Sequence, residues 1–277
     1  MAVMWLIATN CTWVMISGYP DTAMTLDILS QNAIRRCLHL LLVTVGIYIV
    51  LNIMALQRLF QQDAEGAAAL LAVVGTLYSV LYAFATYVIW GQYSAVESEI
   101  LKEAGALKNL MLFSQPLKPD VREPMVRAIK VYAKAVVETE WEALSRHQPI
   151  ERTDRYFREV ISSVSGIKLE GESERALYER LLEIANEASA HRDERLSLSV
   201  KRMPRTLLLF VSAAAAAILL LLFLFPFRSP VLGAVAVGIT TVLFYLAYFV
   251  VTDLDNPFEG TWNVTSDPFG ELITKFR

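Results

Sequence analysis

The chain has 277 residues, of which 55% are hydrophobic and 19% charged, with a formal net charge of −3 and a mean hydropathy of +0.42. This composition is too apolar for an ordinary soluble domain. The small net charge argues against nucleic acid as a partner, and the two cysteines, Cys11 and Cys37, are too few for a disulfide framework. The charged residues crowd between Glu97 and Arg205, which indicates that one chain is adapted to both lipid and water.

Residues 1–37 form an N-terminal extension. Met1 to Tyr19 is apolar but short, is interrupted by polar residues, and lacks the basic leader and cleavage pattern of a signal peptide. Its length favours an interfacial helix over a full membrane span. The extension closes with the basic pair Arg35 and Arg36.

Residues 38–93 contain two apolar stretches that are long enough to cross a bilayer, Leu38 to Gln57 and Ala67 to Gly91. The polar segment between them is so short that the second helix must return antiparallel to the first. Because no proline lies between Ala67 and Gln115, we expect the second helix to continue unbroken from lipid into water.

Residues 94–203 are predicted to form a helical cytosolic domain. Alternating strand patterns and Asn-Gly hairpins are absent from this part of the sequence. Apolar residues recur at helical spacing over residues 121–146 and 172–201, and a shorter helix is expected over residues 152–164.

Residues 204–252 hold two further spans, Thr206 to Phe225 and Val231 to Thr252. The predicted fold class is therefore an all-α membrane protein, with four transmembrane helices in two pairs that flank the helical domain. Basic residues precede the first and third spans, and so the positive-inside rule places both termini and the helical domain in the cytoplasm.

Residues 253–277 form a C-terminal acidic Pro-Phe turn and tail. The words Thr252-Asp-Leu-Asp-Asn-Pro-Phe-Glu-Gly-Thr-Trp-Asn-Val-Thr265 resemble the signature of the prokaryotic bestrophin-like domain family. Further phrases resemble the same family: Gly75-Thr-Leu-Tyr78 running into Trp90-Gly-Gln-Tyr93, Tyr132 onward to Glu140-Trp141, and Arg192 and Arg195 ahead of Met203-Pro204. Together they cover the chain from about Arg58 to Phe269.

This resemblance extends more distantly to the bestrophin anion channels. It implies a homopentamer in a bacterial inner membrane, whose second span lines a central pore for small ions, chloride favoured among them. Matching the Trp-x-Gln-Tyr words places the family's pore constriction on Ala72, Thr76 and Val80. The side chains at the family's constriction are bulky and aromatic, whereas the matched side chains in this sequence are small. In the alternative arrangement the small residues pack helix against helix, and the pore is faced by one of three larger residues: Tyr78, Leu81 and Phe84.

Three acidic residues follow the second span, namely Glu97, Glu99 and Glu103. They could ring the mouth of the conduit, where they would favour cations. A solvated helix face is the alternative interpretation.

The family's acidic run after Asn-Pro-Phe forms a calcium clasp, which makes calcium the one cofactor that the resemblance suggests. Here Asp253, Asp255 and Glu259 surround Asn256-Pro257-Phe258, but a run of consecutive aspartates is missing. Calcium takes six to eight oxygen ligands, and a structural turn is the favoured alternative.

No catalytic motif is legible in the sequence, and we expect no enzyme activity. Glu138, Glu140 and Glu142 alternate along a helix and therefore point apart, so Glu140 is expected to pack inside the bundle with Trp141. If the protein does not conduct ions, the alternative function is a membrane scaffold or signalling subunit whose cytosolic domain binds a partner.

Overall fold

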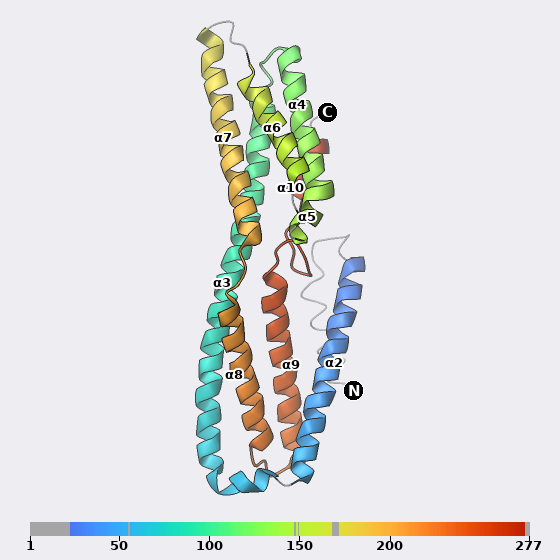
Figure 1. Ribbon diagram of the computed structural model, residues 1–277, viewed down its shortest axis with the longest axis vertical. Coiled ribbons are helices and arrows are strands. Elements are labelled where there is room, and N and C mark those ends of the chain that lie inside the picture. The colour runs from blue at the N-terminus through green and yellow to red at the C-terminus, as the bar shows by residue number, and fades with distance from the viewer. Residues whose placement is uncertain (1–22, 55, 147, 149, 168–171, 275–277) are drawn as a thin grey trace.

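The computed structural model describes residues 23–54, 56–146, 148, 150–167 and 172–274. Within these ranges the regular elements are helices and no strand occurs, which confirms the all-helical fold class. The molecule is elongated, with a bundle of long helices at one end and a helical domain at the other (Figure 1). The interfacial helix expected over Met1 to Tyr19 lies outside the described residues.

Four helices are long and apolar enough to span a membrane, and they correspond to the four predicted spans. They are α2 (Ala23–Ile53), α3 (Ala64–Phe113), α8 (Arg205–Leu224) and α9 (Pro230–Leu254). The helix α2 begins earlier than the first apolar stretch, because the polar residues ahead of it continue the same helix. A 3-10 helix, η1 (Leu56–Asp63), makes the return between α2 and α3.

Small residues let α2 and α9 approach closely near one end. A Cβ atom built on Gly233 of α9 would lie 1.8 Å from the hydroxyl oxygen of Tyr48 on α2. Further along, the hydroxyl of Thr241 donates to that of Thr44 over 3.1 Å. Close approach through small residues is a common way for membrane helices to associate. The two helices then diverge towards the helical domain (Figure 1).

The helix α3 is unbroken for 50 residues, as the absence of proline predicted, and is about 75 Å long. One face of α3 is buried from Ala85 to Met111. Ala85 and Ile89 pack in a cluster with residues of α8 and α9, whereas Ile100 and Leu107 belong to the core of the helical domain. The same helix therefore supports both halves of the molecule.

The helical domain is built from α3, α4 (Pro119–Ala135), η2 (Val136–Glu140), α5 (Trp141–Ser145), α6 (Glu151–Ser165) and α7 (Glu172–Val200). Residues 121–146 were predicted as a single helix, but the π-helical turn η2 interrupts them. The C-terminal helix α10 (Asp267–Thr274) adds Phe269 to the core of this domain, so the tail packs as part of it.

Candidate functional site

The apolar half of α3 has a face that is open to the surroundings of the chain. Ala72, Thr76, Val80 and Phe84 all lie on this face and are exposed, as is Tyr87, which is 78% exposed. With 3.6 residues per turn, steps of three and four residues keep these side chains on one side of the helix. The three positions matched to a pore constriction therefore share the open face.

Tyr78 and Leu81 lie on the opposite face of α3. The ring of Tyr78 stacks on that of Tyr82 and lies 4.6 Å, centroid to centroid, from the ring of Phe244 on α9. Leu81 packs against the cluster that contains Ala85. Within one chain, Tyr78 and Leu81 are therefore partly buried against their own helical bundle, and they do not share the open face with Ala72, Thr76 and Val80. Of the three larger candidates, Phe84 alone is on the open face.

The open face continues along α3 into the helical domain. Ser94, Glu97, Leu101 and Leu112 follow at helical spacing and are exposed, with Leu101 at 57% and Leu112 at 46%. This part of the face is mixed, with Lys108 exposed between the two leucines, and it joins the apolar exposed face of the membrane half. We call the residues from Ala72 to Leu112 on this side the open face of α3.

The three acidic residues after the second span occupy different environments. Glu97 is exposed on the open face. Glu99 turns towards α7, where its carboxylate lies 2.8 Å from Nδ1 of His191 and 2.7 Å from Nζ of Lys102. Partial burial alone would raise the pKa of Glu99, but the hydrogen bonds from Lys102 and His191 bring it below its ordinary value. Glu103 is completely buried, so the expectation that it faces a conduit mouth is corrected.

Glu103 is part of a buried ionic cluster that the sequence analysis did not predict. Its Oε2 accepts a hydrogen bond from Nε of Arg195 over 2.7 Å, and its Oε1 accepts one from the Tyr132 hydroxyl. Nη2 of Arg195 also lies 2.6 Å from Glu140 in η2. Neither Arg195 nor Glu103 has an exposed side chain. Burial and the nearby Glu103 carboxylate both raise the pKa of Tyr132 well above its ordinary value.

Arg192 extends this cluster to α6. Its Nη2 donates to Asp154 over 2.8 Å and to Glu140 over 3.2 Å, and its Nε donates to the Tyr132 hydroxyl over 3.1 Å. Burial alone would raise the pKa of Glu140, but Arg195 and Arg192 outweigh it and lower that pKa. The cluster thereby joins α3, α4, η2, α6 and α7.

A signal for this cluster was present in the sequence. Arg192 and Arg195 fall at helical spacing on the same side of α7 as Leu181, Ile184 and Ala188, which are all buried. Charged side chains within an apolar stripe require buried partners. The sequence could therefore have shown that partners exist, but not which carboxylates they are.

The turn after α9 uses its carboxylates to hold backbone amides. Asp253 accepts from the N–H groups of Thr261 and Trp262, at 3.0 Å and 2.8 Å. Gly260 lies against this carboxylate with φ +96°, a conformation that favours glycine. Asp255 accepts from the N–H of Met203 over 2.6 Å, which fixes the entry of the chain into α8.

The middle of the turn is anchored to the helical domain. The amide nitrogen of Asn256 donates to the carbonyl of Ser145 over 3.2 Å and to Glu259 over 3.1 Å. Pro257 and Phe258 are buried, and the Phe258 ring lies 5.2 Å from that of Trp141. Trp141 and Glu140 thus pack inside the bundle as expected.

These residues do not fit a calcium clasp. The oxygens of Asp253 and Asp255 face backbone donors, whereas calcium requires six to eight oxygen ligands around one point. Over the described ranges, no three His, Cys, Asp or Glu residues are grouped so as to hold a metal ion. The geometry is that of a structural turn, which ties α9, α8 and α5 together.

The fold defines an integral membrane protein with four long apolar helices, one of which extends into a helical domain. The family model of the Bestrophin-like domain matches residues 37–269. The chain belongs to the Bestrophin-like family, as its sequence resemblance indicated.

Solved structures with the same fold come from a bacterial bestrophin homolog of Klebsiella pneumoniae. A mutant of that protein matches with a TM-score of 0.68 and 15% sequence identity, over 87% of this chain and 97% of its own. The structure phased with zinc matches with a TM-score of 0.66 and 14% identity, over 86% and 97%. A comparison with curated proteins gave no match.

Proposed function

We propose that the protein is an oligomeric ion channel in which copies of α3 surround a central conduit. The observation that carries this proposal is the open face of α3, which runs from Ala72 through the membrane half and along the helical domain to Leu112. Membership of the Bestrophin-like family supports it, since the related bestrophins are channels. A homopentamer is the assembly implied by that relationship.

Exposed leucines favour assembly over a lone chain. Leu101, Leu112 and Phe113 are exposed on the part of α3 that lies beyond the membrane half. Covering apolar surface gains roughly 25 cal/mol per Å². A second copy of the chain is a suitable cover, because each copy offers the same stripe and closed symmetry repeats the contact around an axis.

The conduit in the membrane half would be lined by Ala72, Thr76 and Val80. The Thr76 hydroxyl donates to the Ala72 carbonyl over 2.8 Å, so its hydrogen bond is satisfied within the helix. The lining would then be small and apolar, without a fixed charge to choose the sign of the ion. Pores of this kind restrict ions through their width and through the cost of losing water.

Two features of the protein favour ions of opposite charge. The family relationship favours small anions such as chloride. Glu97 is exposed where α3 leaves its apolar half, and a ring of such carboxylates would favour cations. We propose an anion channel in a bacterial inner membrane, with the helical domain and C-terminus in the cytoplasm.

Reconstitution of the purified protein in planar bilayers under a potassium chloride gradient tests the proposal. The expected result is a conductance whose reversal potential lies closer to the equilibrium potential of chloride than to that of potassium. Val80→Phe should reduce the conductance, because the larger ring would narrow a conduit lined by this position. Leu243→Phe, on an exposed position of α9, is the matched control and should conduct normally.

An oligomer that shows no conductance under any ionic condition would refute the channel and favour a scaffold or signalling subunit. A lone monomer would refute the assembly itself. Equal effects of the two phenylalanine variants would refute a lining role for Val80.

A further inference from the structure

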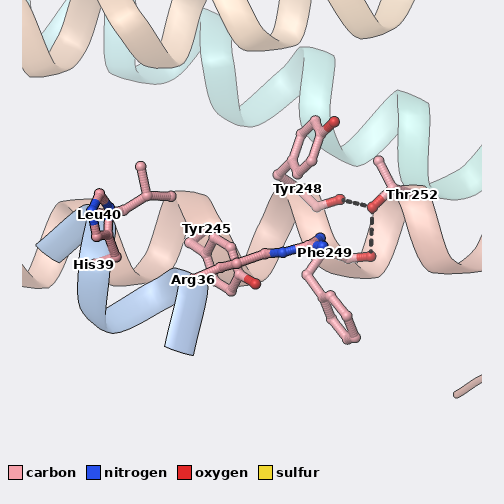
Figure 2. Close-up of a pocket in the computed structure, with 7 residues that line it drawn as sticks. All are labelled: Arg36, His39, Leu40, Tyr245, Tyr248, Phe249 and Thr252. Atoms are coloured by element: carbon pink, nitrogen blue, oxygen red, sulfur yellow. Dashed lines mark hydrogen bonds between the residues drawn. The ribbon is translucent and has the colours of Figure 1, made fainter. Parts of the chain in front are cut away.

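A cavity of about 430 Å³ lies between α2 and α9, at the end of these helices that is nearest the helical domain. It is lined by Arg36, His39 and Leu40 from α2, and by Tyr245, Tyr248, Phe249 and Thr252 from α9. Figure 2 shows the Arg36 side chain extending towards the segment of α9 that carries Tyr245 and Phe249. The cavity is separate from the open face of α3.

The cavity forms where the small-residue contact between the two helices ends. Gly233 and Thr241 allow α9 to lie against α2 along one part of its length. One to two turns beyond Thr241, α9 carries the large side chains of Tyr245, Tyr248 and Phe249. Bulky rings cannot support the same close approach, and the helices diverge there (Figure 1).

The polar side of the cavity is suited to an anion. Among the residues whose side chains the structure describes, which on α2 begin at Gln31, no carboxylate lies within ion-pair distance of Arg36. A guanidinium presents several N–H donors in a fixed plane, which is well matched to phosphate oxygens. His39 and the hydroxyl of Tyr245 line the same cavity and can add donors.

The other side of the cavity is apolar and adjoins the membrane half of the molecule. Leu40 and Phe249 contribute hydrocarbon walls. Leu38 and Leu42, on the stretch of α2 that directly follows Arg36, are exposed and apolar. Arg36 therefore lies where the apolar run of the helix begins, which is the depth at which lipid headgroups meet acyl chains.

An aromatic cluster lies where α3 and α9 leave the apolar half of the molecule. The ring of Trp90 lies 5.9 Å from that of Tyr93 and 6.1 Å from that of Trp262, which follows α9. Tryptophan and tyrosine are enriched at the headgroup level of membrane proteins. The cavity, at this same end of α9, is thus placed at the boundary between lipid and water.

We propose that this cavity binds an anionic phospholipid, with the phosphate at Arg36 and the acyl chains along Leu40 and the exposed apolar stretch of α2 that follows it. The shared chemistry is that of a phosphate group, which free inorganic phosphate also offers. The hydrocarbon walls favour the lipid, because free phosphate would leave them uncovered. The inference does not depend on whether the protein conducts ions.

Native mass spectrometry of the delipidated full-length protein tests the proposal. The probes are short-chain phosphatidylglycerol, phosphatidylcholine of the same chain length, and inorganic phosphate. Phosphatidylglycerol should bind to the unaltered protein more tightly than the other two. Arg36→Gln should weaken this binding about tenfold, the effect of losing a charge-assisted hydrogen bond, and Arg36→Lys should retain most of it.

Arg35→Gln is the matched control. Arg35 is the neighbouring residue on α2, donates to the side chain of Asn32 and does not line the cavity. Its substitution should leave phosphatidylglycerol binding within about twofold, because an exposed charge outside the cavity is screened by solvent and contributes little. Tyr245→Phe supplies a second variant within the cavity and should weaken binding to a smaller extent than Arg36→Gln.

Three results would overturn the proposal. In the first, Arg35→Gln and Arg36→Gln weaken lipid binding equally. In the second, the two phospholipids bind alike. In the third, inorganic phosphate binds as tightly as phosphatidylglycerol and with the same dependence on Arg36, which would show a phosphate site rather than a lipid site.

Discussion

Arg195 on α7 and Glu103 on α3 form an ion pair with 2.7 Å between Nε and Oε2, and both side chains are excluded from solvent. The pair joins the helix that carries the open face to the helix that leads into the third span. Removing one partner of a buried pair leaves an uncompensated charge, which is costly. This cluster therefore fixes the position of α7 on α3.

We expect Arg195→Leu to destabilise the helical domain by about 3–5 kcal/mol. The substitution leaves Glu103 and Glu140 buried without their cation. The measurement is the thermal unfolding midpoint of the purified protein in detergent. Arg175→Leu is the control, because Arg175 and Glu179 form an exposed pair, worth less than about 1 kcal/mol. Equal midpoints for the two variants would show that the buried pair contributes nothing.

Acid should weaken the protein through Glu140 and Glu99. Both have a pKa lowered from the ordinary 4.5, so their contribution is complete above that value and is lost as the pH falls through the folded pKa. The unfolding midpoint should thus stay constant above about pH 5 and fall as the pH drops below about 4.5 towards the lowered pKa values. Glu140→Gln should have a lower midpoint at neutral pH and a smaller fall on acidification. If the midpoint fell equally in Glu140→Gln and in the unaltered protein, Glu140 would not contribute to the acid sensitivity.

Gly233→Ala should loosen the contact between α2 and α9. The new methyl group would lie 1.8 Å from the Tyr48 hydroxyl oxygen, and the second nearest atom belongs to the same ring. Overpacking of this kind costs about 1–3 kcal/mol. Gly46→Ala is the control, since its Cβ would meet no atom within 4 Å. The thermal unfolding midpoints of the two variants measure these effects. An unchanged midpoint for Gly233→Ala would mean that α2 can shift to accommodate the methyl group at no cost.

Leu101→Glu should weaken assembly without unfolding the subunit. Leu101 is exposed on the open face of α3 and is not among the residues of the helical domain's core. A charge at this position should therefore disturb only the contact with a neighbouring subunit. Light scattering after size exclusion should show smaller particles. Val131→Glu on α4, also at an exposed position, should leave the particle size unchanged. An unaltered assembly of the Leu101 variant would place the interface elsewhere.

Calcium should have no effect on stability, since Asp253 and Asp255 bind backbone amides. The unfolding midpoint should be the same with calcium or with a chelator, whereas Asp253→Asn should lower it in both. A rise with calcium that is absent from Asp253→Asn would establish the clasp that the family relationship implies.

The spans and the long α3 were predictable because each depends on a local property, an apolar run or the absence of proline. The position of Glu103 was not predicted correctly, because it was grouped with Glu97, although the two residues lie on different sides of the helix. Its phase relative to Ile100 and Leu107 shows that it faces the core. The π-turn η2 inserts one residue into a helix, and no residue pattern near Glu140 indicated it.

The continuity of α3 has a consequence for protein engineering. Each residue of an α-helix turns the chain by about 100°, so a single residue inserted near Ser94 would rotate the whole helical domain relative to the membrane half. Seven inserted residues would nearly restore the original angle, with a shift of about 10 Å along the axis. Exchange of the helical domain with that of a relative therefore requires matched helical phase at the junction, whatever the sequence similarity of the two domains.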